Sequence, residues 1–488
     1  MKRTLSILRA LALSIPFAAC GSSPETRSVV ETASDQANET GNKQAPGQLM
    51  VGADKQELVL PDDFLPYYGF RGRNFSTVID PLYARCVALN NGENTALFVA
   101  IELGDVGGKE LEGWLADIVE ATGISEEYIY VHAVHTHSAP YAGSDIREDV
   151  TDVEKSDQFA EICGQAILTA VQNSLANMQA ATMNYAAGEC YINVNRNYRY
   201  TGDFSGDIKS AFLTWRNYQN DCDHTVQVIK FDDMEGNTIA YWTNYAVHSL
   251  VTFHVYGWED DMMAITGDIS GRLSTYVEER DKGSVCIFTM GTAGNAMPRY
   301  VGEYWSFDAE GNATTAYLTG EGADQVLQVQ ADELGEAVIT TVRGMDNANA
   351  VSEVTIEALQ TTVSLPGKQK WTAGSPTEAP TGTGEFEYDL DADPLDVDLG
   401  LLKVNDFAFA MVGAEIVTSI GYDIQETLNS NGCSNTMVVS QTNGSAQYIS
   451  DDYGYDNFTF EGVASWAAPG ADQYIVEGLN DLLSNMNG

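Results

Sequence analysis

The sequence predicts an α/β protein built of mixed sheets flanked by helices, and three observations favour this class. Short apolar runs typical of strands alternate along the chain with longer stretches in which apolar residues recur every three or four positions, as on a helix face. Of the 488 residues, 44% are hydrophobic and 10% aromatic, which is enough for a large core and argues against a disordered chain. No repeat and no break in composition divides residues 58–488, so we expect one large domain there.

The predicted elements alternate in order along the chain. Residues 95–101 form an apolar run that indicates a strand, and residues 109–122 have helical spacing that stops at Gly123. Residues 226–231 and 238–247 indicate two strands joined by a hairpin turn with the sequence Asp-Met-Glu-Gly-Asn. We further expect helices at 158–178, 270–279, 332–342 and about 417–428, and strands at 128–135, 285–288, 407–412 and 437–440.

Acidic residues dominate the charge of the chain. There are 70 Asp and Glu side chains against 25 Lys and Arg, which gives a formal net charge of -45. Because neutralising phosphate groups requires clustered Lys and Arg, this balance excludes a nucleic-acid binder of the usual kind. It also disfavours electrostatic docking on anionic lipid.

The N-terminus has the parts of an export signal. Basic residues precede a mostly apolar run, residues 10–19, which is too short to span a membrane. The small residues before a cysteine in Phe17-Ala18-Ala19-Cys20 resemble the lipobox of bacterial lipoproteins, in which that cysteine is lipidated. We therefore expect a lipoprotein signal peptide over residues 1–19, and lipid chains on Cys20 that anchor an exported protein to a bacterial membrane, at the periplasmic or cell-surface side. The alternative is an ordinary cleaved signal followed by an incidental cysteine.

Two further segments have a polar, irregular composition. Residues 20–57 are rich in Ser, Thr, Glu, Gln, Asn and Gly, and we expect them to form a flexible tether. Residues 366–400 contain four prolines and many acids, which predicts a surface insertion in the large domain.

Six cysteines follow the one at the lipobox, and none belongs to a CxxC motif. Export permits disulfides, and Cys190 and Cys222, which flank one polar segment, are a candidate pair. Cys86 and Cys286 lie in apolar runs and are expected to be buried thiols. None of the six has the sequence context of a catalytic cysteine; they are Cys86, Cys163, Cys190, Cys222, Cys286 and Cys433.

The histidines carry the chemical information. His132, His135 and His137 follow one another at the end of a predicted strand, where alternation puts His135 and His137 on one face and His132 on the other. Two imidazoles on one face suit a metal ligand with a neighbouring acid/base group. His248 closes another predicted strand, and strand ends meet at one rim of an α/β sheet. The pattern therefore indicates a zinc site, with a structural or surface histidine pair as the alternative.

Eight short motifs occur in one order along the chain. Three contain candidate site residues: Val134-His135-Thr136-His137-Ser138-Ala139-Pro140, Asn193-Val194-Asn195-Arg196 and Asn244-Tyr245-Ala246-Val247-His248. The other five are Asp80-Pro81-Leu82-Tyr83-Ala84-Arg85, Ile265-Thr266-Gly267-Asp268, Met290-Gly291-Thr292-Ala293-Gly294-Asn295-Ala296-Met297-Pro298, Val412-Gly413-Ala414-Glu415 and Thr442-Asn443-Gly444-Ser445-Ala446-Gln447-Tyr448. Over about residues 58–465, the chain resembles the N-terminal catalytic domain of the neutral, non-lysosomal ceramidase family.

This resemblance implies a metal site. Carried over motif by motif, the family's zinc ligands fall on His135, His248, Glu415 and Tyr448. Imidazole nitrogen and carboxylate oxygen are ordinary zinc ligands, whereas a phenolic oxygen is unusual. Without the resemblance, Glu415 would be interpreted as an exposed acid at the start of a helix.

The resemblance also implies a reaction. His137 would act as general acid/base or stabilise the oxyanion, and Arg196 would balance the developing negative charge, the alternative for Arg196 being a solvated loop residue. The implied activity is that of a zinc-dependent hydrolase that cleaves an N-acyl amide, ceramide-like or another acylated small molecule, by zinc-activated water.

Two departures from the family pattern open other possibilities. Phe460 stands where the family has a second tyrosine, so one expected oxyanion donor is missing. We also expect no C-terminal immunoglobulin-like domain such as ceramidases carry. The alternatives are a zinc esterase and a non-catalytic surface lipoprotein that binds a ligand on the same scaffold.

Overall fold

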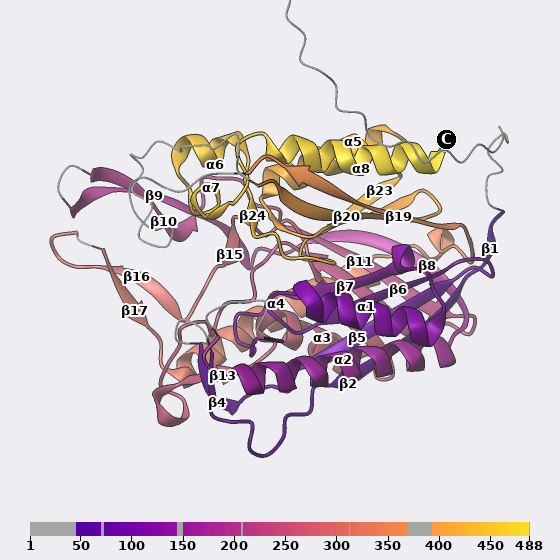
Figure 1. The fold of residues 1–488 in the computed structure, drawn as a ribbon, viewed down its shortest axis with the longest axis horizontal. Helices are drawn as coiled ribbons and strands as arrows, with labels where there is room; N and C mark the ends of the chain where they lie inside the picture. Colours follow the sequence, from indigo (N-terminus) through magenta and orange to yellow (C-terminus); the bar gives the residue numbers. More distant parts are fainter. Residues whose placement is uncertain are drawn as a thin grey trace, which may run out of the picture. The chain divides into compact units, whose positions relative to one another are not determined.

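An eight-stranded mixed sheet lies at the centre of the computed structural model, which describes residues 45–69, 73–143, 150–205, 208–311, 313–367 and 393–487 (Figure 1). Its strand order is β14-β12-β11-β8-β2-β5-β6-β7. The pairs β12/β14 and β6/β7 are parallel, and the other neighbours are antiparallel. The strands are β2 (Met50–Glu57), β5 (Tyr83–Asn90), β6 (Thr95–Ile101), β7 (Ile129–Ala133), β8 (Gln179–Glu189), β11 (Thr225–Asp233), β12 (Thr238–Tyr245) and β14 (Val285–Met290).

This sheet is bent so that its two ends approach each other. The ring of Phe98 in β6 lies 4.2 Å from that of Trp242 in β12, although four strands separate β6 from β12 in the sheet. At the end strands, the backbone N–H of Met290 donates to Nε2 of His132 over 3.1 Å. The bend brings the carboxyl ends of strands from both halves of the sheet to one place.

Helices cover the outer face of each half. The helices α1 (Gly108–Thr122) and α2 (Val153–Ala176) pack on β2, β5 and β6, where Leu97, Val99 and Ile101 point outward into a shared core. The intervening Phe98 points inward, as strand alternation requires. The helices α3 (Asp268–Arg280) and α4 (Gly320–Arg343) pack on β8, β11 and β14.

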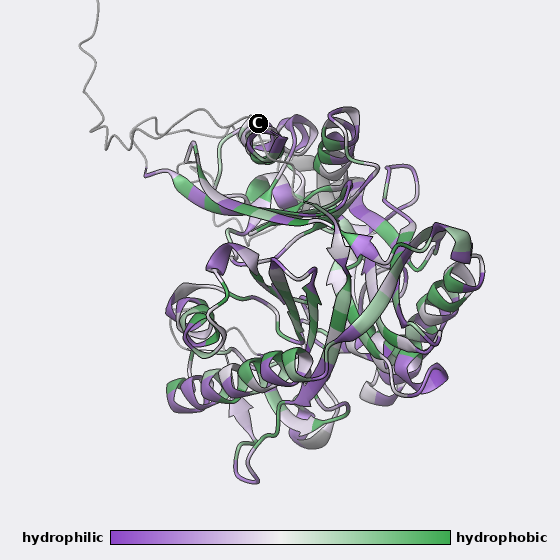
Figure 2. Ribbon diagram, turned by 90° about the vertical axis from the view of Figure 1, so that its right-hand side faces the viewer, coloured by the Kyte–Doolittle hydropathy of each residue, from purple (hydrophilic) through white to green (hydrophobic). Residues whose placement is uncertain are grey.

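A second sheet closes the inner face. It contains β19 (Ile356–Leu365), β20 (Leu395–Val404), β21 (Phe407–Val412) and β23 (Asn435–Val439), in that order. Phe409 packs its ring 4.4 Å from that of Trp242, so both sheets share one core. The outer face is covered by α5 (Thr418–Ser430) and α8 (Ala471–Asn487). Figure 2 shows the resulting helix–sheet–sheet–helix layering, and the expected mixed α/β class in a single domain is confirmed.

Short strands extend this framework around one side. The strands β9 and β10, and the hairpin of β16 and β17, project on the same side of the domain (Figure 1). The remaining elements are β1 (Gly47–Gln48), β3 (Tyr67–Tyr68), β4 (Asn74–Val78), β9 (Asn193–Ser205), β10 (Ile208–Asn217), β13 (Met263–Ile265), β15 (Ala296–Pro298), β16 (Glu303–Phe307), β17 (Ala313–Tyr317), β18 (Glu353–Val354), β22 (Glu415–Ile416), β24 (Tyr448–Ile449), α6 (Asp452–Asn457) and α7 (Phe460–Ala464).

Two predicted boundaries are wrong. Residues 20–57 were expected to form a tether, but the last eight of them form strand β2. The side chains of Val51 and Ala53, which point to the same face of this strand, are buried in the core of the central sheet. The end of the expected insertion over residues 366–400 is the start of β20. The rest of the insertion, residues 368–392, and the tether before residue 45, with Cys20, lie outside the described residues. Among the residues that are described, none of the helices is long and apolar enough to cross a membrane.

The cysteines that follow the lipobox are free and buried. The predicted disulfide between Cys190 and Cys222 is therefore wrong. Both residues are free thiols and pack in the hydrophobic core that includes Tyr245 and Val226. Burial raises the pKa of each of these thiols above its usual value. They serve as small apolar residues, as expected for the pair in apolar runs.

The stacking between the two sheets predicts a large stability effect. Replacing the fully buried Phe409 with alanine should lower the free energy of unfolding by about 3–5 kcal/mol, because it leaves a cavity beside Trp242. Denaturant unfolding measures the loss. The matched control is Tyr474→Ala in α8. Tyr474 is 47% exposed, so its replacement should change the free energy of unfolding by less than about 0.5 kcal/mol. Equal small losses in both variants would contradict the shared core.

Candidate metal centre

The carboxyl ends of strands from both sheets meet at one buried point. His135 follows β7, and His248 follows β12. Glu415 lies in β22 and Tyr448 in β24, where the two residues are direct partners in a parallel pair. All four side chains are at least nine-tenths buried, with 4% of His135, none of His248, 4% of Glu415 and 7% of Tyr448 exposed. The structure thus brings together the four residues that the resemblance singled out.

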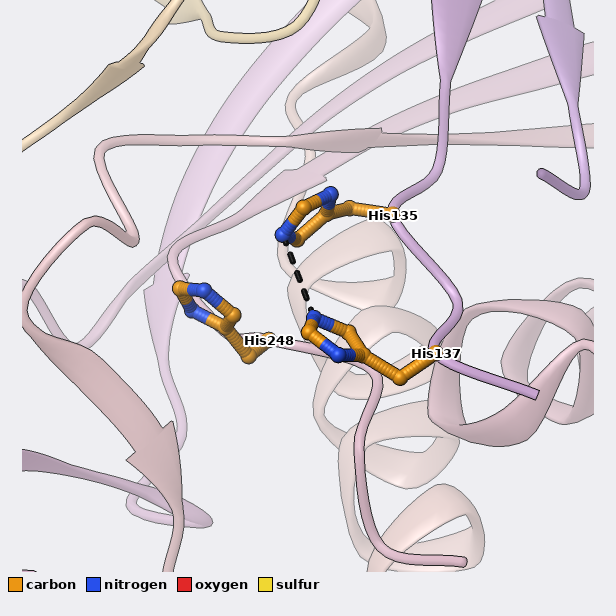
Figure 3. Close-up of side chains that lie close together, drawn as sticks. All are labelled: His135, His137 and His248. Carbon is orange, nitrogen blue, oxygen red and sulfur yellow. Dashed lines mark hydrogen bonds between the residues drawn. The ribbon is translucent and has the colours of Figure 1, made fainter. Parts of the chain in front are cut away.

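Three acceptor atoms converge at the centre of this group. Oε2 of Glu415 lies 2.9 Å from Nε2 of His248 and 3.2 Å from Nε2 of His135. Figure 3 shows His248 facing His135 and His137 from the opposite loop. The ligand nitrogens of these three imidazoles lie within 4.8 Å of one another, which is close enough to hold one metal ion.

Backbone carbonyls decide which nitrogen of each imidazole faces the centre. Nδ1 of His135 lies 2.6 Å from the carbonyl oxygen of Gly104, and Nδ1 of His248 lies 2.9 Å from that of Ala296. Since a carbonyl only accepts, each Nδ1 carries the hydrogen and each Nε2 presents a lone pair. This is the usual outer-shell arrangement of metal-binding histidines. The donor set of this structure therefore fits a divalent metal such as zinc.

His137 differs from the two other histidines. Its Nδ1 lies 3.4 Å from Nη2 of Arg73, and its Nε2 lies 3.3 Å from Nε2 of His135. Because a guanidinium has only donors, Nδ1 of His137 is the acceptor and Nε2 carries the hydrogen. With its hydrogen pointing at the centre, His137 is placed to donate a hydrogen bond there, and Glu415 is the better third ligand.

Arg196 lies against the opposite side of the centre. Its Nη1 is 3.3 Å from Nε2 of His248, and its guanidinium carbon lies 5.3 Å from the centre of the Tyr448 ring. Its Nε donates to Glu461 over 2.8 Å, and Glu461 is fully buried. Arg196 is therefore a buried, ion-paired residue at the centre, which excludes the solvated-loop alternative.

The charges of the centre show up in its pKa values. Burial alone would raise the pKa of Glu415, but the charges and hydrogen bonds of His135 and His248 outweigh it and hold that pKa well below its usual range. Burial opposes a charge on His135 too, yet Glu415 outweighs it and raises the pKa of His135. Burial and Arg196 lower the pKa of His248 to about 4, and burial, His135 and Arg73 lower that of His137. The site thus favours positive charge between His135 and Glu415.

Strand alternation gave the right pair of histidines for the wrong reason. Strand β7 ends at Ala133, and His135 adopts the left-handed conformation with φ 62°. Such a conformation is strained for a bulky side chain, and strain of this kind clusters at functional sites. His132 lies in the strand and is structural: its Nδ1 donates to the Ser440 carbonyl over 2.9 Å, while its Nε2 accepts from a backbone N–H.

Buried polar residues behind the centre hold its loops in place. The carboxylate of Asp268 accepts from the backbone N–H groups of Val251 and Thr252 at 3.1 and 2.9 Å. These residues follow His248 closely, so Asp268 fixes the loop that carries this histidine. Glu415 is likewise not an exposed acid at a helix start but a buried strand residue.

A cavity of about 280 Å³ opens beside the centre. His137, Arg196 and Tyr448 contribute polar groups to its wall, and most of the rest is apolar or aromatic: Leu250, Phe253, Met297, Val301, Tyr304, Trp305 and Phe460. An apolar wall with a few convergent polar groups is typical of a small-molecule site.

Sequence reasoning missed two residues of the centre. Arg73 lies between the rings of Tyr141 and Phe253, at 5.3 and 5.1 Å, and pairs with no carboxylate among the described residues. Glu461 follows directly after Phe460, and sequence reasoning considered only the phenylalanine of this pair. The scarcity of arginine in an acidic chain was the one signal that pointed toward Arg73.

No family model and no curated protein matches this sequence. Solved structures are similar to it, two ceramidases among them. A ceramidase complexed with C2 has a TM-score of 0.68 at 14% identity, over 91% of this chain and 76% of that one. Neutral ceramidase from Pseudomonas aeruginosa has a TM-score of 0.66 at 15% identity, over 91% of this chain and 75% of that one. The chain therefore has the fold of the neutral ceramidases, as its ordered motifs predicted.

Proposed function

We propose that this protein is a zinc-dependent hydrolase of the neutral ceramidase family that cleaves an N-acyl amide. The observation that carries the proposal is the meeting of three lone-pair acceptors, His135 Nε2, His248 Nε2 and Glu415 Oε2, at distances of 2.9 and 3.2 Å. Acceptors that face one another in a buried site repel unless a cation or a proton lies among them, and the lone pairs that the two Nδ1–H bonds leave on Nε2 suit a metal cation. The similarity of this fold to the folds of two ceramidases supports the proposal.

The residues that would hold zinc are His135, His248, Glu415 and Tyr448. Zinc bound there supplies a Lewis acid for the substrate carbonyl and lowers the pKa of water. The hydroxyl of Tyr448 lies 3.3 Å from Nε2 of His248, near enough to the acceptor group to join it. Burial raises the pKa of this phenol, which opposes its ionisation, so Tyr448 is the weakest of the four ligands.

His137 would act on the amide through the hydrogen on Nε2. The contact with Arg73 keeps Nδ1 as the acceptor, so the neutral ring donates the hydrogen on Nε2 to the carbonyl oxygen of the substrate and stabilises the oxyanion that forms there. Its lowered pKa keeps the ring neutral before the reaction. Arg73 is a positioning residue in this scheme.

Arg196 would stabilise negative charge on the same oxygen. Its guanidinium is held by Glu461 at 2.8 Å and faces the cavity beside Tyr448. A preorganised cation of this kind needs no rearrangement when charge develops. Burial lowers the pKa of Arg196, but its neighbours Tyr448 and Glu461 outweigh burial and raise it, so the side chain stays charged.

The cavity supports an acylated substrate. Phe253, Met297 and Trp305 provide an apolar wall for an acyl chain, and His137, Arg196 and Tyr448 provide polar groups from the centre. Phe460 contributes an aromatic edge where a donor would otherwise stand, with its ring 5.4 Å from that of Tyr448. We therefore expect slower amide hydrolysis than with a tyrosine there, since one oxyanion donor typically contributes about 10²–10³ in turnover.

The metal proposal predicts the behaviour of histidine variants. His135→Ala and His248→Ala should each lose most of the zinc that the purified protein holds at one ion per chain, because two of the ligands are imidazoles. Elemental analysis of the dialysed proteins measures this. His137→Ala should keep its zinc, and His224→Ala, which alters a histidine bonded only to Asn193, is the matched control. Undiminished zinc in both ligand variants would refute the assignment.

The reaction proposal predicts a separation of binding and turnover. His137→Ala should lower turnover of N-acyl amides by about 10²–10³, because one oxyanion donor is lost, while its zinc content stays normal. A panel of N-acyl amides and esters assayed with the purified enzyme tests this. A zinc-loaded protein that is inert on the whole panel and yet binds an acylated ligand would instead be a receptor, the role that Phe460 favours. Preference for esters would identify an esterase.

We also propose that Cys20 anchors the protein to a membrane through lipid chains. The motif Phe17-Ala18-Ala19-Cys20 supports this. Mass spectrometry of the mature N-terminus from a bacterial membrane fraction should find a diacylated cysteine, and Cys20→Ser should move the protein to the soluble fraction. An unmodified N-terminus further along the chain would mean an ordinary exported protein.

A further inference from the structure

A second cavity lies on the other side of strand β9 from the candidate metal centre. It encloses about 330 Å³, and Asn195 and Asn197 line it. Arg196, between these two residues, lines the cavity beside the metal centre instead. Because successive side chains of a strand point to opposite faces, β9 forms a wall between the two spaces. We call the second space the polar cavity.

The walls of the polar cavity consist of uncharged hydrogen-bonding groups with a few carboxylates. Five carboxamides line it: Asn195, Asn197, Gln219, Asn220 and Asn295. Hydroxyl groups come from residues such as Ser419, Ser450 and Tyr453. No lysine, arginine or histidine is among the lining residues that the structure describes, and Val417 is the only aliphatic one among them. This composition suits neither an acyl chain nor an anion.

Some of the polar side chains in the walls are open to the cavity. Gln219 is exposed and Asn220 is partly exposed, and Nδ2 of Asn220 makes a long contact of 3.4 Å with the hydroxyl of Tyr453. A carboxamide both donates and accepts, so these groups suit a ligand that carries hydroxyl groups.

The carboxylates of the cavity are already engaged. Glu461 accepts from Arg196 and from Nδ2 of Asn197, both at 2.8 Å. Asp451 accepts from the hydroxyl of Ser419 at 2.6 Å and from a backbone N–H. Asp221 accepts from the backbone N–H of the next residue at 3.0 Å. They retain acceptor capacity for further hydroxyl donors, but no set of them is arranged around an empty centre.

We propose that the polar cavity binds an uncharged polyhydroxylated ligand of the size of one monosaccharide unit. Carboxamides such as those of Gln219 and Asn220, together with the carboxylates of the walls, can take up its hydroxyl groups. Tyr422 and Tyr453, which are 38% and 46% exposed, offer ring faces for its C–H groups at the rim. The volume of the polar cavity lies at the small end of the range for ligand sites, which is about 300–1,000 Å³. The proposal does not depend on the zinc hydrolase assignment, because β9 separates the two cavities.

Saturation-transfer NMR on the full exported chain tests the proposal. The probes are the methyl glycosides of glucose, galactose and mannose, myo-inositol, and glucuronate as the anionic counterpart. We expect at least one neutral probe to bind at millimolar concentration, and glucuronate to bind at least tenfold more weakly because of the nearby carboxylates. Binding of no neutral probe, or equal binding of glucuronate, would overturn the proposal and leave a cavity filled by water.

Asn220→Ala is the decisive variant. The side chain of Asn220 is partly exposed and makes one long contact with the hydroxyl of Tyr453, so its removal should leave the stability of the fold unchanged. The affinity for the neutral probe should nevertheless fall about tenfold, the usual effect of one lost hydrogen bond. Gln219→Ala should also weaken binding, whereas Asn485→Ala on the exposed side of α8 is the matched control. Unchanged affinity in both Asn220→Ala and Gln219→Ala would overturn the proposal.

Discussion

The meeting of His135, His248 and Glu415 is the constraint on which the rest of the site depends. Oε2 of Glu415 lies 2.9 Å from Nε2 of His248 and 3.2 Å from Nε2 of His135, and acceptors this close together in a buried place need a cation or a proton among them. The carbonyls of Gly104 and Ala296 enforce this arrangement, because they take up the hydrogen of each Nδ1 and leave each Nε2 bare. The centre is thus built for positive charge before any ligand arrives, and the pKa shifts of Glu415 and His135 have the same origin.

The architecture serves this meeting. The ligands come from segments as far apart in the chain as β7 and β24, and no single sheet of ordinary twist would bring their ends together. The bend of the eight-stranded sheet, closed by Phe98 and Trp242, moves β7 toward β12, and the four-stranded sheet adds the segments after β21 and β23. The large aromatic core between the sheets therefore positions the residues of the candidate centre as well as stabilising the fold.

Different residues orient the polar side chains on the two sides of the centre. On one side, Arg73 turns His137 so that it donates; on the other, Glu461 holds Arg196 in place. Phe460 completes the apolar cavity but supplies no hydrogen bond. Strand β9 carries Arg196 toward this cavity and two asparagines toward the polar cavity, so one strand serves two chemically different spaces.

Local sequence patterns were sufficient for the fold class, for helices such as α1 and α2, and, through ordered motifs, for four residues that the structure brings together at the candidate metal centre. Hydrophobic periodicity and the order of short motifs are properties of the chain itself, so they can be recognised without the tertiary structure. The tertiary structure decided the rest. Val51 and Ala53 formed too short a signal in a polar segment to reveal a central strand, and β7 ended before alternation could place His135. Arg73 and Glu461 have roles only through partners 64 and 265 residues away, and the pairing of such distant side chains depends on how the sheets bend and pack.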